Sequence, residues 1–204
     1  MSKRQRSELQ RVILHEIALA MKLPKKEGKS FICYEDLKRI WSDKSRITSL
    51  LQLDPSQRGI DIIQESMIGI ISTLMYVGAN DCLADFRARL LDPSSSNPLV
   101  TDDCIPLEMD QLFFLKSEPA LKLQFYKLQF QFNPVKIVLS KSRVVIKNPM
   151  ERLPFESRKK NIGSGGFGKV DLVDISPRYI KGEDGSSWET VSARPNRESL
   201  INML

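Results

Sequence analysis

Histidine and cysteine are scarce in this sequence of 204 residues. The only histidine is His15, and the three cysteines (Cys33, Cys82 and Cys104) are odd in number and form no CxxC pair. This argues against a disulfide framework, a zinc ribbon and a histidine-rich metal site. We expect reduced thiols in a cytosolic or nuclear compartment. For His15 we expect a packing or surface position on a helix.

A long uninterrupted apolar run is also missing. The longest apolar stretch, residues 60–77, contains Asp61 and Glu65 and is too short and too polar to span a bilayer, so we interpret it as a buried core helix. Residues 1–24 are basic and then apolar, but Glu8 and Glu16 interrupt the apolar part that a signal peptide needs. These absences predict an intracellular protein without a membrane span.

The formal net charge of +6 is unevenly distributed. Residues 1–30 hold eight Lys or Arg against three Glu, and residues 141–160 hold seven against two. Residues 81–120 reverse the sign, with three Lys or Arg against eight Asp or Glu. Aromatic residues are not interleaved with the basic runs at a spacing suited to base stacking. We therefore expect solvated faces and no nucleic-acid partner.

The hydrophobic fraction of 41% is sufficient for a real core. Apolar residues recur at helical spacing in four segments of the first half, and a fifth could form a short helix. The four segments are residues 7–23, 34–41, 60–77 and 82–91, and the fifth is 106–115. Trp41 is the expected core anchor at the end of the second. A cluster of breakers over 92–98 predicts a surface loop.

The apolar period changes after residue 120. Leu121, Leu123 and Phe125 alternate with polar residues, and after a phase slip the alternation resumes at Leu128. This pattern favours strands with a bulge or an extended segment, while a short amphipathic helix over 119–128 is the alternative. Residues 135–139 and 143–147 also have the composition of strands.

One motif, at residues 162–170, has residues suited to a chemical function. Its glycines have the spacing GxGxxG, which allows a backbone to turn sharply close to phosphate oxygens. Phe167 at the tip could cover the phosphates, and Val170, two residues after the last glycine, could pack on an adenine. The candidate nucleotide-binding residues are Ile162, Gly163, Ser164, Gly165, Gly166, Phe167, Gly168 and Val170.

The glycine spacing alone does not choose between two nucleotide-binding contexts. Dinucleotide-binding turns require a helix after the third glycine. Here Gly168 is followed by the β-rich run of residues 169–175, so we expect the loop to connect one strand to another, as in protein kinases. A glycine-rich hairpin without a ligand is the remaining alternative.

The segment IGSGGFGKVDLV resembles the first two strands of a eukaryotic-type protein kinase. With the upstream segments FICYEDLKRIW, PLEMDQLFFL and LKLQFYKLQFQFNPVKI, residues 30–180 resemble the amino-terminal part of fungal protein-kinase-domain proteins, in which a helical domain precedes the kinase fold. The resemblance implies an α+β fold that begins a kinase small lobe. It also implies ATP with magnesium as cofactor, a serine/threonine-type activity and a protein substrate.

The resemblance further implies a lysine on the third strand that contacts the α- and β-phosphates. Lys181, in the segment RYIK, is the candidate, and Arg194 is the alternative. The sequence contains no HRD, DFG or APE motif, so we assign no catalytic and no metal-binding residue. We expect a catalytically incompetent, truncated fragment that binds ATP weakly or not at all. Transcript sequence beyond Leu204 would test the truncation.

The expected organisation has five parts. They are a basic helix (1–29), a helical domain (30–118), an extended or β connector (119–155), the start of a kinase-like small lobe (156–180) and a disordered tail (181–204). The alternative function is a non-enzymatic helical interaction or regulatory domain with a vestigial kinase hairpin.

Overall fold

A computed structural model of the chain divides it into two compact units. The helical unit comprises Met1–Met21 and Ile32–Asn133, and the strand unit comprises Lys22–Phe31 and Pro134–Leu204. The structure describes residues 2–21, 30–54, 59–79, 82–90, 100–115, 119–138, 148–165, 168–175 and 179–182. The expected loop at 92–98, the strand at 143–147 and the tail after residue 182 lie outside the described residues.

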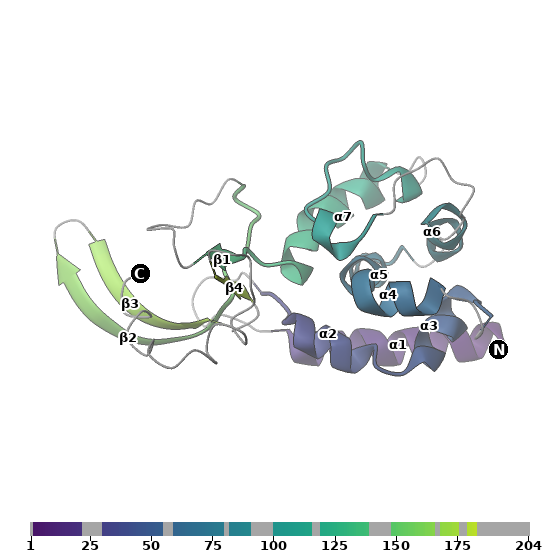
Figure 1. Cartoon of the computed structure of the whole chain (residues 1–204), viewed down its shortest axis with the longest axis horizontal. Coiled ribbons are helices and arrows are strands. Elements are labelled where there is room, and N and C mark those ends of the chain that lie inside the picture. Colours follow the sequence, from purple (N-terminus) through teal and green to yellow (C-terminus); the bar gives the residue numbers. More distant parts are fainter. Residues whose placement is uncertain are drawn as a thin grey trace. The chain divides into compact units, whose positions relative to one another are not determined.

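The helical unit confirms the expectation of an α-rich domain (Figure 1). Its described helices are α1 (Lys3–Ala20), α2 (Tyr34–Ile40), α3 (Lys44–Leu51), α4 (Gly59–Ser66), α5 (Ile68–Tyr76), α6 (Leu83–Leu90) and α7 (Pro119–Phe132), with 3-10 turns η2 (Asp102–Cys104) and η3 (Phe113–Leu115).

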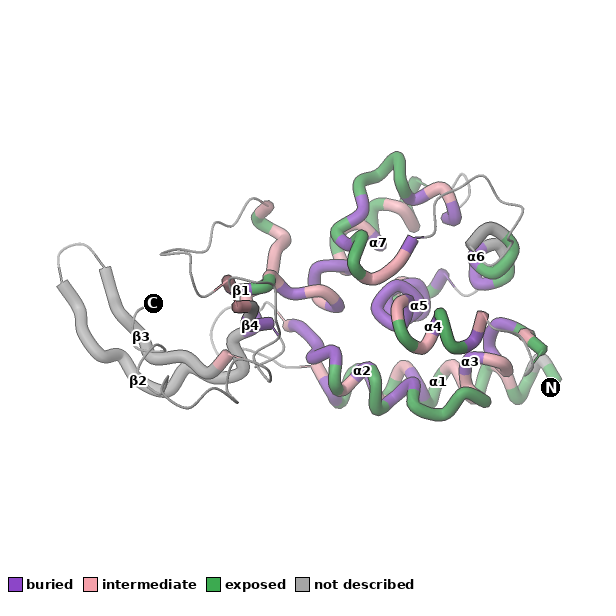
Figure 2. Tube along the Cα trace, viewed as in Figure 1, coloured by how far each residue is buried: buried purple, intermediate pink, exposed green. Residues whose placement is uncertain are grey.

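Helix α5 is the centre of this unit. All eight residues from Ile68 to Met75 are buried, and the helix contacts α1, α2, α4 and α7 (Figure 2). A helix that is apolar on every side needs neighbours on every side, which explains why the other helices surround it. The expectation of a buried core helix in this stretch is confirmed.

The expected single helix over 60–77 is, however, two helices that meet at Met67. The backbone of Met67 leaves the helical region, with φ −133° and ψ 9°. The backbone N–H groups of Gly69 and Ile70 donate instead to the two carboxylate oxygens of Asp102, at 2.9 Å each. The carbonyl of Glu65, which Gly69 would bond in a continuous helix, accepts from the Tyr34 hydroxyl at 2.9 Å. Side chains remote in sequence therefore stabilise the break.

Two other helices differ from the sequence prediction, α1 at its start and α3 in its presence. Helix α1 begins at Lys3 rather than at residue 7, because Ser2 and Gln5 form a reciprocal capping box. Helix α3 was not predicted, although Asp43 caps it by accepting from the backbone N–H of Ser45 at 2.8 Å. Its buried residues Ile47, Leu50 and Leu51 have the same apolar spacing that predicted α2, so the signal was present in the sequence.

The period-two interpretation of residues 121–132 is wrong, because this segment is helix α7. The helical alternative over 119–128 is confirmed and extends to Phe132. The phase slip was the decisive sign, since Leu121, Phe125, Leu128 and Phe132 recur at the four- and three-residue intervals of a helix. Leu123, which belongs to the alternation but not to this series, is 45% exposed.

Residues 106–115 do not form the expected short helix. The segment forms a turn at 109–111 followed by η3, and its backbone is bonded to α7. The buried side chain of Gln129 accepts from the N–H of Leu107 at 2.7 Å and donates to its carbonyl at 2.9 Å. A side chain thus supplies the bonds that a helix would have made internally.

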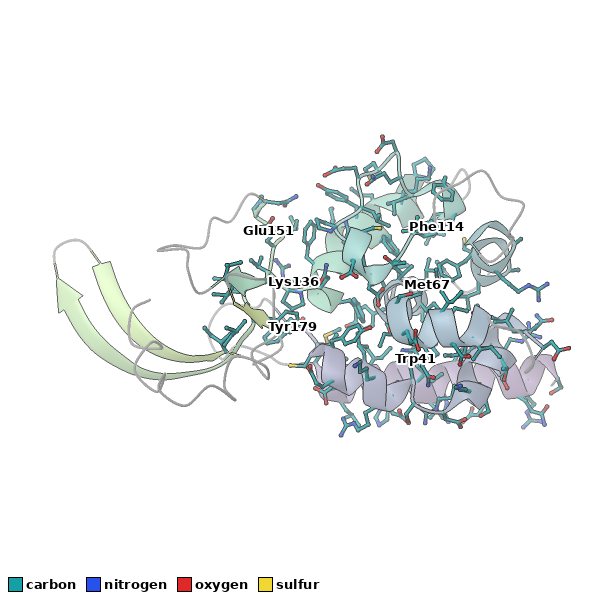
Figure 3. The ribbon with its side chains drawn as sticks, viewed as in Figure 1. Trp41, Met67, Phe114, Lys136, Glu151 and Tyr179 are labelled. Atoms are coloured by element: carbon teal, nitrogen blue, oxygen red, sulfur yellow. The ribbon has the colours of Figure 1, made fainter. Side chains whose placement is uncertain are left out.

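Large side chains fill the core of the helical unit (Figure 3). Trp41 is fully buried, as expected, and its indole N–H donates to the hydroxyl of Ser72 at 2.8 Å. The Phe114 ring packs edge-to-face against Phe86 and Phe125, with centroids 5.9 Å and 5.7 Å apart. Every buried member of this core lies between Ile13 and Phe132.

The strand unit contains two separate strand pairs in its described part. Strand β1 (Ile137–Val138) pairs in parallel with β4 (Ile180–Lys181), and β2 (Phe155–Gly165) pairs antiparallel with β3 (Gly168–Ile175). Neither described sheet has more than two strands. The β content expected after the helical domain is present, but no complete small lobe is formed by these strands.

Candidate functional site

The glycine motif lies at the tip of the β2–β3 hairpin. Gly165 and Gly168 are paired across the two strands and close the tip, Ser164 pairs with Lys169, and Gly163 pairs with Val170. Gly166 and Phe167, which connect the strands, lie outside the described residues. The three motif glycines therefore occupy the last pairs of the ladder. Because glycine has no side chain, the backbone at these positions is open to close approach by a ligand.

The hairpin is irregular along its length. Three register shifts leave Glu156, Lys159 and Ile162 of β2 without a partner in β3. Extra residues of this kind bend a strand and increase its twist, and they are common beside binding sites. The shift at Ile162 comes directly before Gly163, so one of the three irregularities adjoins the motif.

The connection from strand to strand was correctly predicted. Gly168 begins strand β3, whereas a dinucleotide-binding turn would begin a helix there. The geometry therefore removes the dinucleotide-binding interpretation and leaves two: the phosphate-covering hairpin of the kinase type, and a hairpin without a ligand.

Lys181 lies on β4, where it pairs with Val138 of β1. Among the described residues, β4 makes no pair with β2 or β3. The structure therefore places Lys181 on a strand, as the resemblance requires, but not on one that is hydrogen-bonded to the glycine hairpin. Arg194, the alternative, lies outside the described residues.

Arg152 precedes the hairpin by three residues. Its Nη1 donates to the carbonyls of Met150 and Glu151, and its own carbonyl accepts from the N–H of Val135 at 2.8 Å. Partial burial lowers the pKa of the Arg152 guanidinium from its usual value. Nη1 is thus engaged by the backbone that leads into β2, whereas the buried Nε of Arg152 has no hydrogen-bond partner among the described residues.

The other titratable candidates have structural roles. Asp102 binds the start of α5, and Glu35 and Asp36 lie in the first turn of α2, where carboxylates favour a helix. His15 is exposed on α1. The three cysteines are free thiols, of which only Cys104 is exposed. In the described ranges no group of three His, Cys, Asp or Glu side chains is arranged to hold a metal, so we assign none of them to magnesium.

Arg6 and Arg87 both line a cavity in the helical unit and are not among the residues predicted from the sequence. The available signal was the basic excess of residues 1–30, which was interpreted as a solvated face. Only the fold shows that Arg6 of α1 and Arg87 of α6 lie on the same cavity, since 81 positions separate them in the chain.

Comparisons with models of protein families, with curated proteins and with solved structures found no match for this chain. None of the described helices has the length and apolarity that a bilayer crossing requires.

Proposed function

We propose that the β2–β3 hairpin is a nucleotide-phosphate-covering element of the protein-kinase type. The observation that carries the proposal is the placement of Gly163, Gly165 and Gly168 at the closing pairs of an antiparallel hairpin. Glycine at these positions permits backbone N–H groups to approach phosphate oxygens closely, which is the physical role of such loops in phosphoryl-transfer enzymes.

The cofactor implied by this proposal is ATP with magnesium. Gly163 to Gly168 would cover the phosphates, Ile162 and Val170 would border the base, and Lys181 is the candidate for a phosphate contact. ATP would supply the phosphoryl group. A β-hairpin alone is marginally stable and forms only one side of a nucleotide pocket. We therefore propose that these 204 residues by themselves bind Mg-ATP weakly and transfer no phosphoryl group to a protein.

A titration of the ¹⁵N-labelled chain with Mg-ATP tests this proposal. We expect amide shifts confined to the β2–β3 tip at millimolar nucleotide, and no calorimetric binding at micromolar concentration. Gly165→Ala should abolish the shifts, because a side chain blocks the approach of the phosphates. Gly59→Ala in α4 is the matched control and should leave them unchanged. Absence of amide shifts at the tip would refute the assignment of the hairpin to nucleotide binding. Micromolar affinity for Mg-ATP, or phosphoryl transfer, would refute the proposal that the chain binds weakly and is inactive.

A second function is favoured by the independent core of the helical unit. The buried core members among the described residues all lie within residues 13–132, which supports a function that does not need the hairpin. On this alternative the chain is a non-enzymatic interaction or regulatory domain. The 73%-exposed Leu19 and the 40%-exposed Val12, seven residues apart on α1, would be part of its contact surface. Co-purification of a stoichiometric partner that depends on Leu19 and not on Gly165 would favour this function.

A further inference from the structure

A cavity of about 550 Å³ lies in the helical unit, bordered by α1, the end of α3 and the start of α6. Its volume is within the range of roughly 300–1,000 Å³ that is usual for small-molecule sites. Part of its lining is apolar and comes from Leu50, Leu51 and Leu83, each only 3% exposed. The remainder includes two arginines, Arg6 and Arg87.

Both guanidinium groups are oriented by one residue, Gln52. This residue ends α3 in the left-handed conformation, with φ 53° and ψ 44°. Nη1 of Arg87 donates to the carbonyls of Leu51 and Gln52, at 3.1 and 2.9 Å. With the amide of Gln52 turned so that its oxygen faces Arg6, that oxygen accepts from both terminal nitrogens of the guanidinium. The two cations are thus held at one end of the same helix.

These contacts leave donor capacity unused. Nε of Arg6 is buried and has no hydrogen-bond partner in the part of the chain that the structure describes. A buried donor without an acceptor is unfavourable, and such groups are rare unless a ligand or water completes them. The bonds of Arg87 to the described residues use only Nη1, so the rest of its planar fork remains available for an acceptor.

Within the described residues, the charge of the two arginines is also uncompensated. Elsewhere in the helical unit, Arg11 pairs with Glu8 at 2.7 Å and Arg46 pairs with Glu16 at 2.6 Å. Neither Arg6 nor Arg87 has a carboxylate partner among the described residues, and none of the described lining residues is acidic. Two cations that border one partly apolar cavity favour an anion with two negative charges.

We propose that this cavity binds a small phosphate monoester. Its dianionic phosphate accepts hydrogen bonds from Arg6 and Arg87, and its organic part packs on Leu50, Leu51 and Leu83. The planar guanidinium fork matches phosphate oxygens in pairs, which is the usual reason for arginine at phosphate sites. A carboxylate carries one charge and would leave the second cation unmatched. This site is separate from the glycine hairpin and does not depend on its assignment.

The test uses the full chain, labelled with ¹⁵N, and four probes. Phenyl phosphate should shift the backbone amides of Ser7, Gln10, Gly78 and Ala84, which line the cavity. Inorganic phosphate should bind more weakly because it lacks the apolar part, and benzoate more weakly because it carries half the charge. Benzyl alcohol should not bind. The affinity for phenyl phosphate should fall as salt is added.

Variants connect the shifts to the arginines. Arg6→Gln and Arg87→Gln should each weaken phenyl phosphate binding by about tenfold or more, as expected for loss of a charge-assisted bond. Arg11→Gln is the matched control, since it removes the same charge from α1 outside the cavity. Because Arg87 also caps α3, thermal melts must show that each variant is folded, and Arg6→Gln carries the test if Arg87→Gln is not.

Three outcomes would overturn the proposal. They are no shift of the lining amides, equal binding of benzoate and phenyl phosphate, and undiminished binding by folded Arg6→Gln. Gly165→Ala should leave phenyl phosphate binding intact, so that failure of this site and failure of the nucleotide hairpin can be told apart.

Discussion

At the junction of α4 and α5, individual side chains replace the hydrogen bonds of a continuous helix. Asp102 receives the N–H groups of Gly69 and Ile70, and the Tyr34 hydroxyl donates to the carbonyl of Glu65. The carboxylate is also favoured there by the positive end of the α5 dipole. The first turn of α5, which is buried from Ile68 to Met75, thus has partners for its backbone groups.

Gly69 leaves room for the Asp102 carboxylate in this arrangement. A Cβ at this position would lie 2.9 Å from Oδ1 of Asp102, closer than real contacts allow. We therefore expect Gly69→Ala to destabilise the protein, although alanine is favoured over glycine in a helix interior by about 1 kcal/mol. Asp102→Ala should cost about 1–3 kcal/mol, because it leaves two backbone donors without their acceptor. Urea denaturation measures both free energies of unfolding.

The matched control for Gly69 is Gly59→Ala, a substitution at the first residue of the neighbouring helix α4. We expect it to be neutral or slightly stabilising. If Gly69→Ala were as well tolerated as Gly59→Ala, the close approach of Asp102 would have no energetic consequence and the explanation of the helix break would be wrong.

A second residue-scale prediction concerns pH. Arg46 binds Glu16 through two contacts, of 2.6 and 3.0 Å, and this hydrogen bonding lowers the pKa of Glu16 below its ordinary value of 4.5. A carboxyl with a lowered folded-state pKa stabilises the fold above its unfolded-state pKa. That contribution is lost as the pH falls through the folded-state pKa.

Denaturation of the wild type and Glu16→Gln between pH 3 and 7 tests this. We expect the wild type to be more stable above about pH 5, and the difference to shrink as the pH falls. In an Arg46→Gln background the Glu16 substitution should have much less effect at every pH, because the partner is gone. A difference that persists unchanged at low pH would show that the pair is not its source. Partial exposure of both side chains keeps the expected effect modest.

At the scale of elements, α7 organises the irregular segment before it. Gln129 makes two hydrogen bonds to the backbone of Leu107, and Asn133 donates to the carbonyl of Ile105 at 2.8 Å. The side chain of Gln129 is fully buried, so these bonds form away from water. Residues 105–107 therefore have an ordered path without being helix or strand.

We expect Gln129→Leu to destabilise the protein by about 2 kcal/mol or more, because it leaves the N–H and carbonyl of Leu107 unpaired. Gln124→Leu makes the same chemical change on the exposed side of α7 and should be nearly neutral. Thermal or urea unfolding of the two variants gives the comparison. Equal effects would indicate that the cost arises from the added leucine and not from the lost bonds.

The secondary structure was predictable where an element is set by its own residues. The buried face of α1 at Ile13 and Ile17, and the hairpin around the glycines, follow from local spacing. Helix α7 was ambiguous, since its apolar residues fit a period of two with a slip as well as a helical period. Tertiary packing resolves this, because Phe125 and Phe132 join the core while Leu123 stays exposed.

At the scale of the whole molecule, the two units have different autonomy. Among the described residues, the core of the helical unit includes none beyond Phe132. We therefore expect a fragment of residues 1–133 to fold alone, with a helical circular dichroism spectrum and a cooperative urea transition. A fragment that starts at residue 134 should lack a cooperative transition, because a two-stranded hairpin is marginal in water and because the fragment omits Lys22–Phe31 of the strand unit. A non-cooperative 1–133 fragment would contradict the division into units.

The sequence by itself determined an α-rich domain, a buried helix near residue 70 and a glycine motif that joins two strands. Each depends on residues close together in the chain, whose spacing sets local backbone geometry. The tertiary structure decided the rest: the break at Met67, the pairing of Lys181 with β1 and the convergence of Arg6 and Arg87 on one cavity. These features depend on partners 30 or more positions apart, such as Gly69 and Asp102. Local periodicity carries no information about contacts that form only when the chain is folded.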